Sequence, residues 1–406
     1  MRSTPKPAVW VRAFNAGARL VQRTGFGFAS LAPDEIVHSA VVRAGCSDFG
    51  PEDGWREGLQ VLVEDYHRHA GLTPIGRLAA RRHLIDLLAN RLWLEHDRAR
   101  HPEITRRPIR APLFIVGLPR TGTTLLHMLL AQDPQNRVPE TWEVMHPAPA
   151  EGTEDKRAER AGHELAWMER LAPGFRVMHP LAPHLPQECI AIDSHTLQGY
   201  EFQTTHYVPN YQRWLEQREK HGIYDHHHRF LQYLQWQRPG RHWVLKAPAH
   251  LFGLAELLAI YPDAGIIQTH RNPLEVMASL ASLSTLLRGA FSEAVDPHAI
   301  GREMALRWGD GLLKSLRQRE CGEVPADRFI DVDYRNVVCA PINTVERIYA
   351  HFGRALDSKA EKAMRDFLAA NPKDKHGTHR YSLEEFGLDR TEQARRFAGY
   401  RTRFGC

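Results

Sequence analysis

Four short runs of mainly apolar residues, all in the second part of the chain, predict β-strands. They cover residues 113–116, 243–245, 265–267 and 329–332, and the first is bounded by Pro112 and Gly117. A continuous apolar run of this length is typical of a strand buried on both faces. Helical periodicity separates the runs, at about 123–131, 250–260, 273–287, 297–319 and 341–352. Strands that alternate with helices predict an α/β fold with a parallel sheet flanked by helices.

The first hundred residues carry a different pattern. Residues 34–100 have helical spacing throughout, and no strand pattern precedes residue 110. Three prolines in 101–112 indicate a connector. The sequence therefore predicts an N-terminal helical region, 1–108, followed by a second domain, 109–406. Within that domain, residues 155–240 are rich in helical patterns and predict a helical insertion near the substrate.

Residues 9–23 predict a basic amphipathic helix, which belongs to an acid-free segment, 1–30. At 100° per residue its apolar side consists of Trp10, Phe14, Gly17 and Val21, and the opposite side consists of Arg12, Arg19 and Arg23. Three interpretations remain open. The helix packs its aromatic face on the body of the protein, lies on an anionic membrane surface, or belongs to an organelle transit segment.

Outside this segment the chain has no net charge. The formal net charge is +5, and residues 1–30 alone account for it with five basic residues and no acid. The remainder is balanced, so no nucleic-acid partner is expected. The five cysteines are widely spaced and form no C-x-x-C pair, which favours a reducing compartment and a cytoplasmic location. No apolar run is expected to reach the roughly 20 residues of a membrane span.

A glycine-bounded loop, GLPRTGTT at 117–124, joins the first predicted strand to the next predicted helix. Such a loop directs backbone N–H groups toward one point, and the helix dipole adds positive potential there, so the site suits a phosphate. It resembles a P-loop, but Thr123 stands where that motif requires lysine. The cation is Arg120 instead. This difference disfavours ATP hydrolysis and kinase chemistry.

The segment PRTGTTLL at 119–126 resembles the 5′-phosphosulfate loop of the sulfotransferase family, in its broad bacterial branch. A second element of that family, an Arg followed eight residues later by a Ser on the 3′-phosphate, matches Arg271 and Ser279. The resemblance covers about 112–390 and implies a sheet related to that of nucleotide kinases. It also implies the donor 3′-phosphoadenosine 5′-phosphosulfate (PAPS). The implied donor-binding residues are Arg120, Thr121, Gly122, Thr123, Thr124, Leu125, Arg271, Ser279, Tyr334 and Arg380.

Sulfuryl transfer needs a base for the acceptor hydroxyl and a cation for the leaving phosphate. Arg120 is suited to the leaving group. Glu140 occupies the place of a catalytic glutamate in the tyrosylprotein branch of the family, and His250 is the alternative base, although its spacing from Lys246 departs from the family pattern. Lys246 is expected to assist phosphate binding or to orient the acceptor. No metal is required.

The run Asp225-His226-His227-His228 does not predict a metal site, because successive helical side chains point 100° apart. An exposed helix turn is expected there. The sequence thus favours a cytoplasmic, PAPS-dependent sulfotransferase with a small-molecule, lipid or glycolipid hydroxyl acceptor, and peripheral membrane contact through 9–23 as an open question. The alternatives are a P-loop ATP-dependent kinase and a membrane-associated, non-catalytic nucleotide-binding protein.

Overall fold

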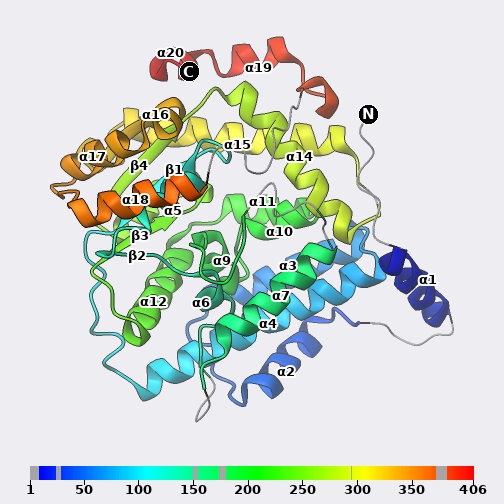
Figure 1. The fold of residues 1–406 in the computed structure, drawn as a ribbon. Helices are drawn as coiled ribbons and strands as arrows, with labels where there is room; N and C mark the ends of the chain where they lie inside the picture. Colours follow the sequence, from blue (N-terminus) through cyan, green and yellow to red (C-terminus); the bar gives the residue numbers. More distant parts are fainter. Residues whose placement is uncertain are drawn as a thin grey trace.

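Five parallel strands form a sheet in the order β2-β3-β1-β4-β5 in the computed structural model (Figure 1). The strands are β1 (Leu113–Gly117), β2 (Asn136–Arg137), β3 (His242–Lys246), β4 (Gly265–His270) and β5 (Phe329–Asp333). The structure describes residues 9–23, 29–149, 154–171, 173, 180–293, 295–371 and 382–406. The four predicted strands and the α/β fold are confirmed. Strand β2 was missed because two polar residues carry no periodic signal.

The side chains of β1 alternate between the two faces of the sheet, as a strand requires. Leu113 and Ile115 belong to a hydrophobic cluster with residues of α5 (Thr123–Leu130), α17 (Pro341–His351) and α18 (Ser358–Ala370). Phe114 and Val116 belong to a larger cluster with residues of α12 (His221–Gln237), α13 (Leu254–Ile260) and α15 (Pro297–Glu320). Both faces of the sheet are therefore covered by helices, which explains why the central strand β1 is apolar throughout.

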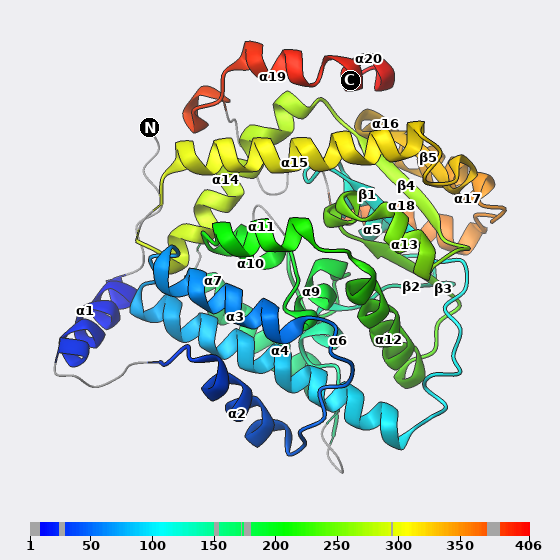
Figure 2. The same cartoon turned by 180° about the vertical axis from the view of Figure 1, so that it is seen from behind.

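The predicted N-terminal helices and the predicted helical insertion are both present, and they share the larger cluster. The N-terminal helices are α2 (Pro33–Ala44), α3 (Trp55–Arg68) and α4 (Pro74–Arg100). The helices after β2 are α6 (Thr141–Met145), α7 (Arg157–Leu171), α9 (Cys189–Asp193), α10 (Glu201–Thr205) and α11 (Pro209–Gln217). In Figure 2 the N-terminal helices lie across the molecule from the C-terminal α19 (Arg390–Arg396) and α20 (Ala398–Phe404). The domain boundary at 108/109 stays a prediction.

Short elements complete the described part of the chain. These are η1 (Ser194–Thr196), η2 (Pro248–Phe252), η3 (Ala326–Arg328), η4 (Glu384–Phe386) and α16 (Tyr334–Cys339). The predicted helix at 250–260 is two helices, η2 and α13, which meet at Gly253.

Helix α1 (Val9–Arg23) has the predicted bounds but not the orientation that packs its aromatic side on the body. The side chains that it buries are Val11, Asn15 and Ala18. Trp10, Phe14 and Val21 are all exposed. The interpretation that the aromatic face packs on the body is therefore wrong.

Helix α14 (Pro273–Phe291) corrects a second expectation. Within the described residues, one helix is long and apolar enough to cross a membrane, and it is α14, with a mean hydropathy of 1.2. The sequence-based expectation overlooked it because its serines and threonines interrupt the apolar run. In the structure 61% of the qualifying window is buried, and α14 packs against α15 and α4. It is a core helix of this fold.

Candidate active site

The loop between β1 and α5 has the backbone shape of an anion cradle. Its backbone has positive φ at Gly117 (+138°), Arg120 (+68°) and Gly122 (+86°). Gly122 is the N-cap of α5 and supplies no side-chain hydrogen bond to the first turn. The first N–H groups of a helix have no partner within the helix. Without a side-chain cap, those of α5 are available to an anion at the end of the helix.

Thr121 holds this loop against the sheet. Its Oγ1 lies 2.6 Å from the carbonyl oxygen of Leu118 and 2.6 Å from Oγ1 of Thr269, the penultimate residue of β4. Thr269 Oγ1 in turn lies 3.2 Å from the carbonyl oxygen of Val116 in β1. The Thr121 hydroxyl is thus engaged in shaping the loop, which links its conformation to the paired ends of β1 and β4.

The approach of β1 to β4 leaves no room for a side chain at Gly117. A Cβ there would lie 2.5 Å from Thr269 Oγ1 and 2.6 Å from the Thr269 carbonyl oxygen. With the positive φ added, Gly117→Ala is expected to lower the free energy of unfolding by about 1–3 kcal/mol. Urea denaturation measures this loss. Gly399→Ala is the matched control, because a Cβ there meets nothing within 4 Å in helix α20. An unchanged stability of Gly117→Ala would contradict this geometry.

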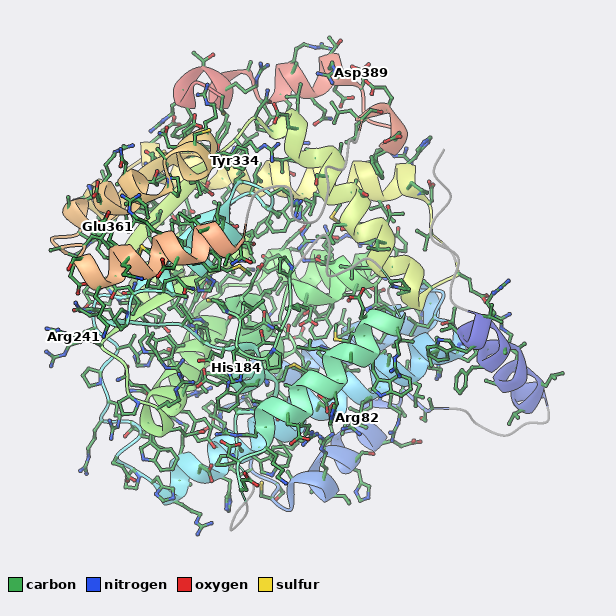
Figure 3. The ribbon with its side chains drawn as sticks, in the orientation of Figure 1. Arg82, His184, Arg241, Tyr334, Glu361 and Asp389 are labelled. Carbon is green, nitrogen blue, oxygen red and sulfur yellow. The ribbon has the colours of Figure 1, made fainter. Side chains whose placement is uncertain are left out.

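Arg271 joins the end of β4 to the loop. Its Nη1 donates a hydrogen bond of 2.9 Å to the carbonyl oxygen of Arg120, and Nε and Nη2 bond Glu275 in the first turn of α14. Its guanidinium lies 4.2 Å from the ring centroid of Tyr334, the first residue of α16. Figure 3 labels Tyr334 at this end of the sheet. The structure therefore brings together three predicted donor-site residues: Arg120, Arg271 and Tyr334.

His270, the residue before Arg271, is held through both nitrogen atoms of its ring. His270 Nδ1 lies 2.6 Å from the hydroxyl of Tyr400, and His270 Nε2 lies 2.8 Å from Asp331 in β5. The ring of Phe404 stacks on the imidazole at 3.7 Å. Burial lowers the pKa of His270 below its ordinary value, in spite of the Asp331 carboxylate, which raises it. These contacts stabilise the backbone from which Arg271 projects.

The remaining predicted donor-site residues are placed less directly. Ser279 is buried on α14, a helix that Asn272 caps by accepting a hydrogen bond from Leu274 N. Thr123 and Thr124 open α5, and Leu125 follows them. Arg380 lies outside the described residues.

An ion pair that the sequence did not predict lies beside the first turn of α5. Lys246 ends β3 and is 2% exposed, and its Nζ donates to Thr124 Oγ1 at 3.4 Å. The same ammonium forms an ion pair with Glu188, the N-cap of α9. Although the loop has Thr123 in place of a lysine, an amine therefore reaches the start of the loop helix from another strand. Sequence reasoning missed Glu188 because no motif surrounds it.

The positive charge of Lys246 also affects a buried histidine of the loop helix. His127, on α5, has its pKa lowered to about 3, first by burial and second by the Lys246 ammonium. Its Nε2 lies 3.2 Å from the carbonyl oxygen of Val244. His127 is thus held neutral, and it serves the packing of α5 on β3.

Glu140 is the N-cap residue of α6 and is held by three donors. Its Oε2 accepts from His184 Nδ1 and Trp142 Nε1, both at 2.8 Å, and its Oε1 accepts from Arg238 Nη1 at 2.9 Å. Burial raises the pKa of Glu140, but these three hydrogen bonds outweigh that effect and lower it. In Figure 3 His184 lies apart from Tyr334, so Glu140 belongs to a separate part of the site region.

A short antiparallel pairing connects the two glutamates. Gln187 N donates to the Pro139 carbonyl oxygen at 2.7 Å, and Thr141 N donates to the Leu185 carbonyl oxygen at 3.0 Å. Glu140 therefore lies within this pairing, opposite Pro186, and Glu188 directly follows the paired residue Gln187. One carboxylate is thus held by three donors, and the other is paired with a lysine beside the loop helix.

His250 is enclosed in the core. It is 1% exposed, its Nδ1 lies 3.2 Å from the Tyr224 hydroxyl, and its ring centroid is 5.2 Å from that of Phe114 in β1. Burial lowers the pKa of His250 to about 3. The imidazole is therefore neutral and packed among aromatic rings, an environment that suits a core residue.

The histidine run on α12 is also buried, contrary to expectation. His226 and His227 are both fully buried, and burial lowers the pKa of each well below its ordinary value. His227 Nδ1 lies 2.7 Å from the Tyr261 hydroxyl. The expected exposed turn is wrong because this face of α12 packs on the sheet and α13. Among the described residues no group of three or more His, Cys, Asp or Glu side chains is placed to hold a metal ion.

Known proteins resemble this chain in sequence and in fold. A model of the sulfotransferase family matches residues 112–358. The crystal structure of sulfotransferase STF1 from Mycobacterium tuberculosis H37Rv superposes with a TM-score of 0.80 at 33% identity, covering 92% of this chain and 99% of that one. The crystal structure of sulfotransferase STF9 from Mycobacterium avium superposes with a TM-score of 0.81 at 30% identity. The match covers 91% of this chain and 96% of that one.

A curated relative adds a chemical class. Omega-hydroxy-beta-dihydromenaquinone-9 sulfotransferase Stf3 of Mycobacterium tuberculosis (strain CDC 1551 / Oshkosh) is 27% identical over 300 residues, which is 68% of this chain and 71% of that protein. Its counterpart from Mycobacterium bovis matches equally.

Proposed function

The chain belongs to the sulfotransferase family, and from that premise we propose that it takes the sulfuryl group from PAPS and passes it to a hydroxyl group of a lipid or other small molecule. The observation that carries the proposal is the contact of Arg271 with the glycine-bounded loop, through the Arg120 carbonyl oxygen. One ligand with two phosphate groups fits a loop cradle and an arginine that are physically joined.

The donor would lie on residues from four parts of the chain. The uncapped first turn of α5, at Gly122–Leu125, and the backbone of Thr121 suit the 5′-phosphosulfate. Arg271 and Ser279, with Tyr334 beside them, suit the 3′-phosphate, and Arg380 is proposed as a further phosphate contact. PAPS supplies an activated sulfuryl group, whose bond to the 5′-phosphate oxygen breaks as the bond to the acceptor oxygen forms.

The chain itself supplies charge and a base. We propose that the guanidinium of Arg120 and the ammonium of Lys246 stabilise the negative charge that develops on the leaving phosphate. For the base, we favour a glutamate over His250, whose neutral ring is buried among aromatic residues. The two candidates are Glu188, which pairs with Lys246 beside the loop helix, and Glu140. Glu140 has its pKa lowered by its three donors, which makes it a weaker proton acceptor than an ordinary glutamate.

Glu188 has a way to gain basicity that Glu140 lacks. Lys246 contacts both Thr124 and Glu188. An anion bound at the start of α5 would compete with Glu188 for the same ammonium. A carboxylate that loses its cation becomes a better proton acceptor. We therefore propose that Glu188 accepts the acceptor's proton, with Glu140 as the second candidate.

The two alternative functions are less well supported. A P-loop kinase uses the lysine that this loop replaces with Thr123, and Thr123 is buried here. A non-catalytic binding protein has no use for a buried lysine paired with a glutamate beside the phosphate loop, since that arrangement costs desolvation energy.

The proposal predicts a ligand preference. Adenosine 3′,5′-bisphosphate, the product of transfer, should raise the midpoint of thermal unfolding in the absence of any divalent metal, because both phosphates have sites. ATP with Mg²⁺ should raise it less, because the loop lacks the lysine for its β- and γ-phosphates. Differential scanning fluorimetry and calorimetric titration measure both. Tighter binding of ATP–Mg²⁺ than of the bisphosphate would overturn the proposed function.

For the acceptor, we propose a hydroxyl-bearing lipid, with a glycolipid or a smaller alcohol as alternatives. The support is the similarity to Stf3, a protein named for its action on a menaquinone derivative. A cytoplasmic enzyme that contacts the membrane through residues 9–23 would reach such an acceptor, and no nucleic-acid partner is proposed. Incubation of the enzyme with ³⁵S-labelled PAPS and a cell lipid extract would identify the labelled product.

A further inference from the structure

Helix α1 presents its apolar side to solvent. Along the helix, Val9 is 72% exposed, Trp10 40% and Leu20 63%. At 100° per residue these positions lie within one third of the circumference, and the buried residues Val11, Asn15 and Ala18 lie on another side. An amphipathic helix on a globular protein ordinarily turns its apolar stripe inward. Helix α1 instead packs on the body of the protein through the side that carries Val11, Asn15 and Ala18.

Specific polar contacts fix this orientation. Asn15 Oδ1 accepts a hydrogen bond of 2.9 Å from the backbone N–H of Ile75, in the first turn of α4. That N–H is one of the groups that a helix start leaves without a partner in the helix. Arg19 forms an ion pair with Glu293. Figures 1 and 2 both draw α1 at the periphery, beside the first turns of α4. The apolar side therefore faces outward because its opposite edge is held.

A second helix extends this surface. On α7, Trp167 is 55% exposed and Met168 is exposed beside it. The Trp167 and Trp10 rings meet edge to face, with centroids 6.2 Å apart. The guanidinium of Arg170 lies 5.0 Å from the Trp167 ring centroid. We call these five exposed apolar residues the α1–α7 face: Val9, Trp10, Leu20, Trp167 and Met168.

Basic side chains around the α1–α7 face indicate an anionic binding partner. Arg12 on α1 and Arg170 on α7 are exposed at its rim, while Arg19 is already paired. Tryptophan rings with arginines beside them are typical of helices that lie in the interface of an anionic bilayer. A basic side chain near such a surface strengthens binding to anionic lipid.

We propose that the α1–α7 face inserts into the interfacial layer of a bilayer that contains anionic phospholipid, and so docks the enzyme on the membrane. The inference deepens the membrane contact of the proposed function, by adding α7 and by assigning the inserted residues. It does not depend on PAPS or on the sulfuryl chemistry.

Vesicle sedimentation of the full chain tests this docking. The wild-type protein should sediment with phosphatidylcholine–phosphatidylglycerol vesicles, less with phosphatidylcholine alone, and less as salt rises. The double variant Leu20→Asp/Trp167→Asp should bind the anionic vesicles at least about tenfold more weakly. Leu306→Asp is the matched control, because Leu306 is exposed on α15, away from this face.

Two results would overturn the docking proposal. One is vesicle binding by the double variant that equals that of the control. The other is a wild-type dimer, seen by light scattering, that the double variant loses while vesicle binding is absent, since a second copy would then cover the face. Stabilisation by adenosine 3′,5′-bisphosphate should be equal in all variants, so a failure of docking is distinguishable from a failure of the proposed function.

Discussion

Replacing Lys246 with methionine is expected to lower kcat for sulfuryl transfer by about 10²–10³, the range for removing one donor to a developing charge. Methionine fills a comparable buried volume without the ammonium. Lys246 is the cation that the structure places on Thr124, at the first turn of α5. The transition state should therefore lose more stabilisation than the bound donor does, and the Kd for adenosine 3′,5′-bisphosphate should change less than kcat.

The design must separate a lost charge from a damaged fold. Lys246→Met leaves Glu188 without its ion-pair partner, which is destabilising at a site this buried. The double variant Lys246→Met/Glu188→Gln should recover thermal stability and still lack activity. Lys362→Met is the control for loss of a lysine, because Lys362 is exposed on α18. Turnover of Lys246→Met within threefold of wild type would remove Lys246 from the reaction.

The sheet could be predicted from sequence because its inner strands, β1, β3 and β4, are buried on both faces. A run such as 113–116 is apolar at every position, and that signal does not depend on distant contacts. Strand β2 has only Asn136 and Arg137, so nothing local marks it. The loop at 117–124 was predictable for a related reason, since glycines at defined offsets produce its shape within one segment.

Features that depend on tertiary packing could not be predicted. Periodicity divided α1 into an apolar and a basic side, but it could not tell that Asn15 would bond the start of α4 and turn the apolar side outward. The same limit applied to His226 and His227, whose burial is decided by the elements that pack on α12. Glu188 meets Lys246 only because the segment before α9 pairs with the segment around Glu140.

The comparison of Glu188→Gln with Glu140→Gln is expected to identify the base. Each glutamine keeps the shape of the side chain but cannot accept a proton. Glu188→Gln should lower kcat by about 10²–10⁴, the usual contribution of a positioned base, and should retain binding of adenosine 3′,5′-bisphosphate. Glu140→Gln should lower kcat less. In the profile of rate against pH, the rise on the acidic side should persist in Glu140→Gln and be lost in Glu188→Gln.

Glu140→Gln should instead change the pH dependence of the free energy of unfolding. The hydrogen bonds of His184, Trp142 and Arg238 lower the pKa of Glu140 in the folded protein, in spite of its burial. A lowered folded-state pKa contributes stability above the unfolded value, about 4.3, and this contribution is lost as the pH falls through the folded value. The difference in unfolding free energy between wild type and Glu140→Gln should therefore narrow on acidification.

The remaining outcomes also assign the base. If Glu140→Gln loses transfer together with the acidic limb while Glu188→Gln turns over normally, the base is Glu140, and the donors around it must rearrange when the acceptor binds. If both variants retain near-normal turnover, the role passes to His250, which would then have to leave its packing against Phe114 to be reached by a hydroxyl. That movement would require opening of the core beneath β1. The buried position of His250 is thus itself an argument that a carboxylate is the base.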